Sequence, residues 1–518
     1  MWPVILRNAA SGYLRVLTTV AVGFLVTPLM VRELGVADYG LWVLMQAITA
    51  YFINLDLGLR RALIHETAIR RARGEEDSIP EATGPFFLIF VAIGILVCLL
   101  TLLVSALLPY LFNLAPGSVD TGRFLLLVLG ITWALQFPSN AAVGVLLGYE
   151  RYDGTNALAV ASRVVQGVAT AGALLNGAGV EALAIILAAT EGARALANVV
   201  LAYRVVPGFG ISIRNADWAR LRSATKRSMS FFVNASNGML TSRADELMIG
   251  AFMTVGAVGV YGVGLRVVNL TRTFGGQLDE VLMPVLARLT DTRQGRRELG
   301  DVMLKATRVT AGLATSITLV LVVFGEPFLK LWIGTEVEEA YYPLVILAVM
   351  SYFAMIQGLN VRILLASEQH KATSLLTLAT MVLNVILSLV LIQRFGLIGV
   401  AAGSLIAVSA PAIVRIQMGC RVAGLSPWRF VFSGLMPSLA PALVAGLAGF
   451  GLQEVWRVNS WPLLAIEIGA VMLLYSVPLV LLSFPLRRSW ALVRETLALT
   501  FPPRQPVPGV STAGPVKE

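Results

Sequence analysis

Several arginines lie inside segments that are otherwise apolar, and they are the residues of this sequence best suited to chemistry. An ionised side chain at mid-bilayer costs about 2.5 to 3.5 kcal/mol on insertion scales, so each one needs water, a partner or a ligand. A guanidinium group stays charged and donates paired hydrogen bonds to phosphate oxygens. The arginines in apolar segments are Arg15, Arg163, Arg194, Arg243, Arg266, Arg272 and Arg362.

Arg266 is the strongest candidate for a ligand contact. It has no Asp or Glu within four residues along the chain and falls near the middle of a helix expected over 257–280. Other arginines allow a plainer interpretation, because a long basic side chain near a helix end can extend to the membrane surface. This snorkelling is the alternative for Arg15, Arg60, Arg163 and Arg362.

Two pairs of opposite charge also allow neutralisation along one helix. Glu191 precedes Arg194 by three positions, and Arg243 precedes Glu246 by the same spacing. Residues three apart are neighbours on a helix face, so each pair can form an ion pair without any ligand. Both interpretations of these four residues stay open at this point.

The composition sets the surroundings of these residues. Hydrophobic residues make up 57% of the 518 positions and charged residues 14%, which excludes an ordinary water-soluble domain. Several runs contain no charged residue and exceed the roughly 20 residues that a spanning helix needs. Because the runs lack the alternation of barrel strands, we predict an all-α membrane protein with about fourteen transmembrane helices. Among these uncharged runs are 82–119, 340–361, 372–393 and 430–453.

The expected helices divide into two lobes, an appended pair and a tail. We predict an N-lobe over 1–210 with helices 1 to 6 and a C-lobe over 211–425 with helices 7 to 12. Helices 13 and 14 would occupy 426–485, and a cytoplasmic tail 486–518. If the N-terminus is cytoplasmic, most of the 40 Lys and Arg lie beside the helices on that side, as the positive-inside rule requires. We therefore expect a multi-pass protein of the cell (inner) membrane with both termini in the cytoplasm, and no nucleic-acid partner.

Matched features recur along the chain at a nearly constant offset of about 220 positions, which indicates an internal duplication. Since six helices separate the members of each match, the two lobes should share one orientation and face each other across a central cavity. The matches are Tyr39-Gly40 with Tyr261-Gly262, Glu150 with Glu368, and Gly179 with Gly396.

Three stretches resemble one known family. Residues 32–42 read RELGVADYGLW and are followed by LDLGL at 55–59. The second half begins with DELMIG at 245–250 and AVGVYGVGLR at 257–266, and Asn384 precedes RFGLIG at 394–399. In this order the stretches resemble polysaccharide flippases of the Wzx type, within the multidrug/oligosaccharidyl-lipid/polysaccharide exporter superfamily.

The resemblance implies a fold of two six-helix lobes around a cavity, with helices 13 and 14 added. It also implies a flippase that moves undecaprenyl-diphosphate-linked oligosaccharide from the cytoplasmic to the periplasmic leaflet by alternating access. We hypothesise that Arg266 and Arg243, with Arg60 and Arg163 nearer the cytoplasmic mouth, hold the pyrophosphate while the polyprenyl tail stays in lipid. The expected partners are the lipid-linked glycan, membrane lipids and other polysaccharide-assembly membrane proteins.

Two aspartates of the family-like stretches are candidates for coupling transport to an ion gradient. Asp56 lies in LDLGL and Asp245 begins DELMIG. The alternative for Asp56 is an ion pair with Arg60, one helical turn away, and for Asp245 a partner on a neighbouring helix. The sequence does not separate these interpretations.

Other functions fit less well. A multidrug or cation antiporter of the same superfamily needs carboxylates facing its cavity, whereas the spans here contain as many arginines as acids. A membrane polymerase or ligase needs a sizeable external loop, and the longest one expected covers only 110–123. His65 and His370 are both expected in the cytoplasm, and no nucleotide-binding loop occurs, so we expect no enzyme activity, metal or cofactor.

Aromatic residues near the expected outer membrane surface have two interpretations. Trp and Tyr gather at membrane interfaces, where their rings anchor a helix. Anchoring is favoured here over a role as sugar-binding platforms. The residues concerned are Tyr39, Trp42, Trp332, Tyr341 and Tyr342.

Overall fold

The computed structural model describes residues 2–56, 58–207, 209–211, 243–269, 286, 289 and 293–483. These residues form helices and short connections, with no strand among them. Ten helices in this described part are long and apolar enough to cross a membrane. The predicted all-α membrane class is confirmed, whereas the count of about fourteen spans stays a prediction. Arg272 and the tail 486–518 lie outside the described residues.

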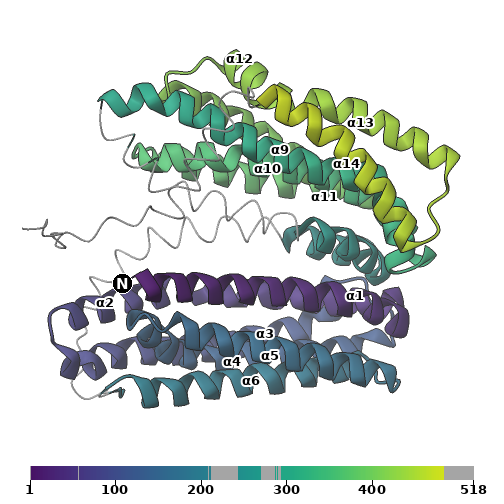
Figure 1. The fold of residues 1–518 in the computed structure, drawn as a ribbon. Coiled ribbons are helices and arrows are strands. Elements are labelled where there is room, and N and C mark those ends of the chain that lie inside the picture. Colours follow the sequence, from purple (N-terminus) through teal and green to yellow (C-terminus); the bar gives the residue numbers. More distant parts are fainter. Residues whose placement is uncertain are drawn as a thin grey trace, which may run out of the picture.

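The helices form two groups in chain order (Figure 1). The N-terminal group consists of α1 (Trp2–Ile53), α2 (Leu59–Ala72), α3 (Ile79–Leu111), α4 (Ser118–Gly148), α5 (Tyr152–Leu175) and α6 (Val180–Val205), with short 3₁₀ turns η1 (Asn54–Asp56) and η2 (Glu76–Ser78). The C-terminal group contains the helical residues 243–252, a helix Val255–Asn269, α9 (Arg293–Trp332), the turn η3 (Thr335–Ala340), α10 (Tyr341–Ala366), α11 (His370–Val422), the short α12 (Pro427–Arg429) and η4 (Phe430–Leu435), α13 (Met436–Val455) and α14 (Trp461–Ser483).

Two of these helices are bent so strongly that each holds two segments. α1 turns at Gly35, where φ is 78° and ψ 165°. α11 turns at Gly396, where φ is 56° and ψ −131°. A positive φ is readily adopted only by glycine, which has no Cβ to clash with the backbone. The chain therefore reverses within one residue at each point, and the two arms of each helix lie beside each other.

The internal duplication is visible in the backbone of two turns. Glu150 and Glu368 both have φ of 60°, and they are the only described residues other than glycine with positive φ. Each follows a long helix and closes it with the same bonds. The Glu150 N–H donates to Leu147 O at 3.0 Å, and the Glu368 N–H donates to Leu365 O at 3.2 Å. The sequence match between Glu150 and Glu368 thus corresponds to two turns with the same backbone conformation and the same hydrogen bond.

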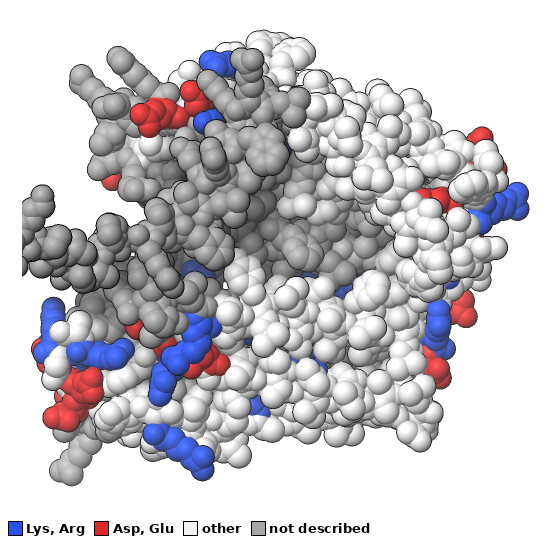
Figure 2. All heavy atoms as spheres, in the orientation of Figure 1, with Lys and Arg blue, Asp and Glu red and all other residues white. Residues whose placement is uncertain are grey.

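The two groups are separate bundles with a membrane-like surface. In Figure 1 the purple and blue helices α1 to α6 lie together, and the green and yellow helices α9 to α14 lie together beside them. Figure 2 shows Lys, Arg, Asp and Glu mostly at the two ends of the molecule, with a broad band of uncharged atoms between them. This band matches what a hydrocarbon core requires. The lobe boundaries at 210 and 425 stay a prediction.

The groups touch closely at the end where α1 turns at Gly35, called here the Gly35 end. Gly40 and Gly259 lie at the crossing of α1 and helix Val255–Asn269. A Cβ on Gly40 would come within 2.0 Å of Val255 O, and one on Gly259 within 2.4 Å of Val36 O. Only glycine allows such backbone contact, so these residues hold the two helices together.

A side chain of α1 adds a second link at the Gly35 end. The Arg32 guanidinium donates to Ile333 O at 2.8 Å and to Trp332 O at 3.2 Å. These carbonyls stand at the C-terminal end of α9, where helix carbonyls lack partners and the helix dipole favours a cation. The Trp332 indole donates back to Phe24 O at 3.1 Å. The cavity described next lies between the groups, deeper than this contact.

Candidate functional site

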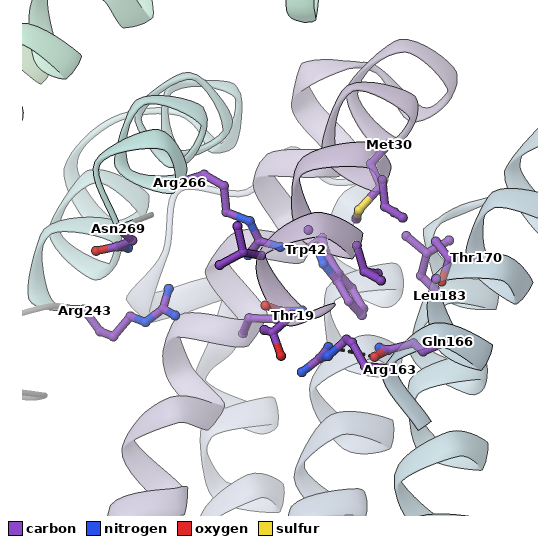
Figure 3. A pocket seen from close by; sticks show the side chains of 16 residues that line it. Thr19, Met30, Trp42, Arg163, Gln166, Thr170, Leu183, Arg243, Arg266 and Asn269 are labelled. Atoms are coloured by element: carbon purple, nitrogen blue, oxygen red, sulfur yellow. Dashed lines mark hydrogen bonds between the residues drawn. The ribbon is translucent and has the colours of Figure 1, made fainter. Parts of the chain in front are cut away.

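A cavity of about 390 Å³ lies between the two groups and holds most of the predicted ligand contacts (Figure 3). Its walls come from both arms of α1, from α5 and α6, and from the segment 243–269. The described lining residues are Thr19, Val20, Val22, Gly23, Val26, Met30, Trp42, Gln46, Arg163, Gln166, Gly167, Thr170, Leu183, Arg243, Arg266 and Asn269.

Three arginines reach this cavity from different helices. Arg163 comes from α5, whereas Arg243 and Arg266 come from the C-terminal group. In Figure 3 Arg243 and Arg266 approach from one side and Arg163 lies beside Gln166. Because no Asp or Glu occurs among the described lining residues, the wall is cationic. Such a wall attracts an anion with several oxygens.

Arg266 is the least compensated of the three. It is exposed and makes no ion pair or hydrogen bond with another described residue. Its guanidinium crosses toward α1 at Gly23, where an added Cβ would lie 2.9 Å from Arg266 Nη2. Glycine therefore leaves the space that the guanidinium occupies. The side chain is free to bind a ligand between the two groups.

The other two arginines have partners. Arg163 is half-buried and donates from Nη1 to Gln166 Oε1 at 2.7 Å. Arg243 forms an ion pair with the fully buried Glu246, with Nη1 and Oε1 2.9 Å apart. Arg243 and Glu246 therefore neutralise each other along one helix, which is one of the two interpretations that the sequence left open. It reduces the charge that Arg243 offers without removing its guanidinium from the wall.

The second expected pair is also formed, away from the lining. Arg194 contacts Glu191 on α6, and Gln136 of α4 donates to Glu191 Oε2 at 2.9 Å. Glu191 is buried, and neither it nor Arg194 lines the cavity. These residues satisfy each other inside the N-terminal group.

Arg60 does not line this cavity. It begins α2, where it is exposed. Asp56 ends η1 four positions earlier. The positive charges of Arg60 and Arg61 attract its carboxylate. One oxygen of Asp56 is buried and has no hydrogen-bond partner among the residues that the structure describes. The ion-pair alternative for Asp56 therefore has the required neighbours, but Arg60 is not brought to Arg266.

Asp245 is held in a buried polar cluster of the C-terminal group, called here the Asp245 cluster. It is 5% exposed. Tyr261 donates its hydroxyl to Asp245 Oδ2 at 2.6 Å, and Ser404 donates to the same oxygen at 2.6 Å. Asn384 donates to Oδ1 at 3.3 Å. The partners on neighbouring helices that the sequence left open are therefore present.

The bend of α11 explains how this cluster forms. Asn384 and Ser404 lie on opposite arms of α11, and Asn384 Nδ2 donates to Ser404 Oγ at 2.7 Å. The arms approach closely beyond the bend, because a Cβ on Gly399 would come within 2.2 Å of Leu391 O. The turn at Gly396 thus brings residues twenty positions apart to one carboxylate.

The aromatic residues require a correction. The favoured role as membrane anchors is wrong for three of them, because Tyr39, Trp42 and Trp332 are at most 7% exposed. Trp42 lines the cavity and Trp332 stacks on Phe24. The role remains consistent with Tyr342, which is 62% exposed. The sequence did contain one indirect sign of this side of the helix: the polar residue Gln46 follows Trp42 by one helical turn in an apolar segment. Gln46 lines the same cavity.

Comparison with known proteins agrees with this architecture. Residues 29–342 match the family model described as "Polysaccharide biosynthesis protein". The chain belongs to this family. The resemblance seen in the sequence stretches is thereby confirmed. The matched range includes Arg163, Arg243, Asp245 and Arg266.

Two curated proteins are similar to this chain over nearly its whole length. The "Probable low-salt glycan biosynthesis flippase Agl15" of Haloferax volcanii is 25% identical over 90% of this chain and 93% of its own length. The "Uncharacterized membrane protein EpsK" of Bacillus subtilis is 22% identical over 88% of this chain and 90% of its own.

Solved structures show the same fold. The lipid II flippase MurJ in an inward closed conformation has a TM-score of 0.66 and 15% identity, over 92% of this chain and 98% of that one. An inward-facing multidrug resistance transporter of the MATE family has a TM-score of 0.62 and 16% identity, over 78% of this chain and 98% of that one. Agl15 and both solved structures carry the names of flippases or transporters, in agreement with a protein that is not an enzyme.

Proposed function

We propose that this family member flips undecaprenyl-diphosphate-linked oligosaccharide from the cytoplasmic to the periplasmic leaflet of the cell (inner) membrane. The observation that carries the proposal is the cationic cavity between the two groups, where Arg266 has no partner among the described residues and lines the wall with Arg163 and Arg243. A diphosphate supplies several anionic oxygens, and guanidinium groups bind such oxygens with paired hydrogen bonds. The relative Agl15, described as a probable flippase of glycan biosynthesis, supports the same assignment.

Alternating access would use the contacts between the groups. Gly40, Gly259 and Arg32 join the two groups at the Gly35 end, and in our proposal this contact closes the cavity toward that side. Release there requires the contact to open while the opposite side closes, with the N-lobe and C-lobe moving as units around the cavity. The contact combines the Arg32 hydrogen bonds with buried apolar side chains of both groups, and its opening would have to break both.

Asp245 is the aspartate better placed for ion coupling. Its cluster joins helix Val255–Asn269 to both arms of α11 and lies on the same segment as Arg243. A proton or a sodium ion bound at this carboxylate would change its hydrogen bonds and the packing of these helices. Asp56 lies apart from the cavity lining and would couple only through η1.

The test replaces Arg266 with Ala in a host deleted for this protein. With wild type restored, undecaprenyl-linked oligosaccharide should not build up on the cytoplasmic leaflet. Arg266→Ala should leave at least a tenfold excess there, because a lost charge-assisted hydrogen bond costs about 1.5 to 3 kcal/mol. Arg362→Ala is the matched control, since this arginine of α10 does not line the cavity.

Mass spectrometry of the lipid-linked pool, with leaflet accessibility probed by an added glycosidase, gives the readout. Wild-type behaviour of Arg266→Ala would remove the proposal. Unchanged pools on deletion, together with altered sensitivity to cationic drugs, would instead support the multidrug antiporter.

A further inference from the structure

Three polar groups of the cavity wall are left without hydrogen bonds. The Trp42 indole N–H, the Gln46 amide and the Thr170 hydroxyl have no hydrogen-bond partner among the described residues. None of these three polar groups is fully enclosed by the described residues, and all three residues line the cavity. Trp42 and Thr170 are nevertheless 7% exposed as whole residues. Most of each side chain is therefore buried, and the polar groups remain available to a ligand in the cavity that these residues line.

These groups lie on the wall formed by the N-terminal group. Trp42 and Gln46 belong to the second arm of α1 and Thr170 belongs to α5. In Figure 3 Thr170 and Met30 lie on the side of the cavity opposite Arg243, and Trp42 lies between Arg243 and Thr170 in this view. The wall is therefore divided into a charged part, mostly from the C-terminal group, and a neutral part from α1 and α5.

The chemistry of the neutral part selects among ligands. An apolar chain placed there would leave three polar groups without partners, at about 1 to 3 kcal/mol each. A phosphate only accepts hydrogen bonds, so it would leave the Gln46 carbonyl oxygen unsatisfied. A sugar ring offers hydroxyls that donate and accept, and an apolar C–H face that suits the Trp42 ring.

We infer that Trp42, Gln46 and Thr170 form a carbohydrate subsite that holds the first sugar of the lipid-linked glycan beside the diphosphate. The inference rests on the proposed function and extends it. The arginines bind the part common to all polyprenyl diphosphates, whereas the α1 and α5 wall distinguishes the sugar. At about 390 Å³ the cavity is near the lower end of small-molecule sites, so the rest of the glycan extends beyond the wall.

The test uses the purified full-length protein in lipid nanodiscs and four probes. One probe is a short-chain polyprenyl diphosphate, and the others carry glucose, galactose or N-acetylglucosamine on the same lipid. Titration calorimetry gives Kd for each. Wild type should bind at least one sugar-bearing probe more tightly than the bare lipid. Gln46→Leu, Trp42→Phe and Thr170→Val should each reduce that preference by about fivefold to tenfold, with the bare lipid unchanged within about twofold.

Thr190→Val is the matched control, because this threonine of α6 donates to Ile186 O at 2.8 Å and does not line the cavity. It should keep the sugar preference. Thermal unfolding of each variant identifies any that fail to fold, and Thr170→Val keeps the shape of the side chain.

Arg266→Ala separates the two proposals. It should weaken the bare lipid and the sugar-bearing lipids equally. Normal binding of the bare lipid to Arg266→Ala would count against the proposed function. The subsite would be overturned if wild type showed no sugar preference, or if all three subsite variants kept that preference. If Arg266→Ala still lost binding in either case, the diphosphate site would remain supported.

Discussion

Two charged residues of the segment 243–269 have opposite surroundings. Arg266 enters the cavity, is exposed and has no partner among the described residues. Asp245 is 5% exposed and accepts hydrogen bonds from Tyr261, Ser404 and Asn384. Within a membrane a charge is satisfied either by water and ligands in a cavity or by fixed donors. Only the first arrangement leaves hydrogen-bonding capacity for a substrate.

Arg243 is intermediate between these two cases. It lines the cavity with Arg266, yet it is paired with Glu246, which is buried beside Asp245. The cationic character of the wall therefore depends most on Arg266 and then on Arg163. Exchanging charges at these positions tests whether the distinction between a free and a fixed charge holds.

Reversing the free charge should have the largest effect. Arg266→Glu replaces the unpaired cation by an anion facing the diphosphate, and like charges in contact cost several kcal/mol. Flipping of the lipid-linked oligosaccharide should fall at least about 100-fold. The melting temperature should stay at the wild-type value, because the side chain is exposed and has no partner within the described part of the chain. A large drop in melting temperature would show that Arg266 is structural.

Removing the fixed charge should act on stability. Asp245→Ala leaves the hydroxyls of Tyr261 and Ser404 without their acceptor and Asn384 with only its bond to Ser404, at roughly 3 kcal/mol of unfolding free energy. Denaturation in detergent measures the change. Asp120→Ala is the control, since this carboxylate is 93% exposed and should cost about 0.5 kcal/mol or less. Equal stability of the two variants would contradict a satisfied cluster.

A conservative change at the same position separates coupling from stability. Asp245→Asn keeps the shape of the side chain but can neither bind a proton nor carry a negative charge. Flipping driven by a proton or sodium gradient should fall about tenfold, while binding of the substrate lipid persists. Asp56→Asn should keep the gradient response. If Asp56→Asn loses this response and Asp245→Asn retains it, the coupling aspartate is Asp56.

The smallest effect is expected at Arg163. Its guanidinium already bonds to Gln166, and Arg266 and Arg243 remain when it is removed. Arg163→Gln should weaken binding of the bare polyprenyl diphosphate about threefold, as expected for one partly solvated cation among three. Arg194→Gln, outside the cavity lining, is the comparison and should leave this Kd unchanged. A larger effect at Arg194 would place the charged site elsewhere.

Charges were easier to predict than neutral contacts. Arg163, Arg243 and Arg266 stood out because a charge in an apolar helix is costly and rare. Trp42 and Thr170 gave no such signal, since both residue types are common in membrane helices for other reasons. Arg415 was also missed because it lies near a helix end, yet it is 4% exposed and donates to Gln357 at 2.6 Å. Burial of a helix end depends on which elements pack against it, so it cannot be predicted from the residues of that helix alone.

The sequence by itself determined the membrane class, the repeated turn at Glu150 and Glu368, and the arginines that need a partner or a ligand. Hydropathy, glycine placement and the cost of a buried charge are local properties, so they can be read from the chain. Only the tertiary structure decided which charges are free. Asp245 receives donors 16, 139 and 159 positions away, and Arg266 meets Gly23 across the two groups. Such contacts arise from helix packing, which fixes direction as well as distance.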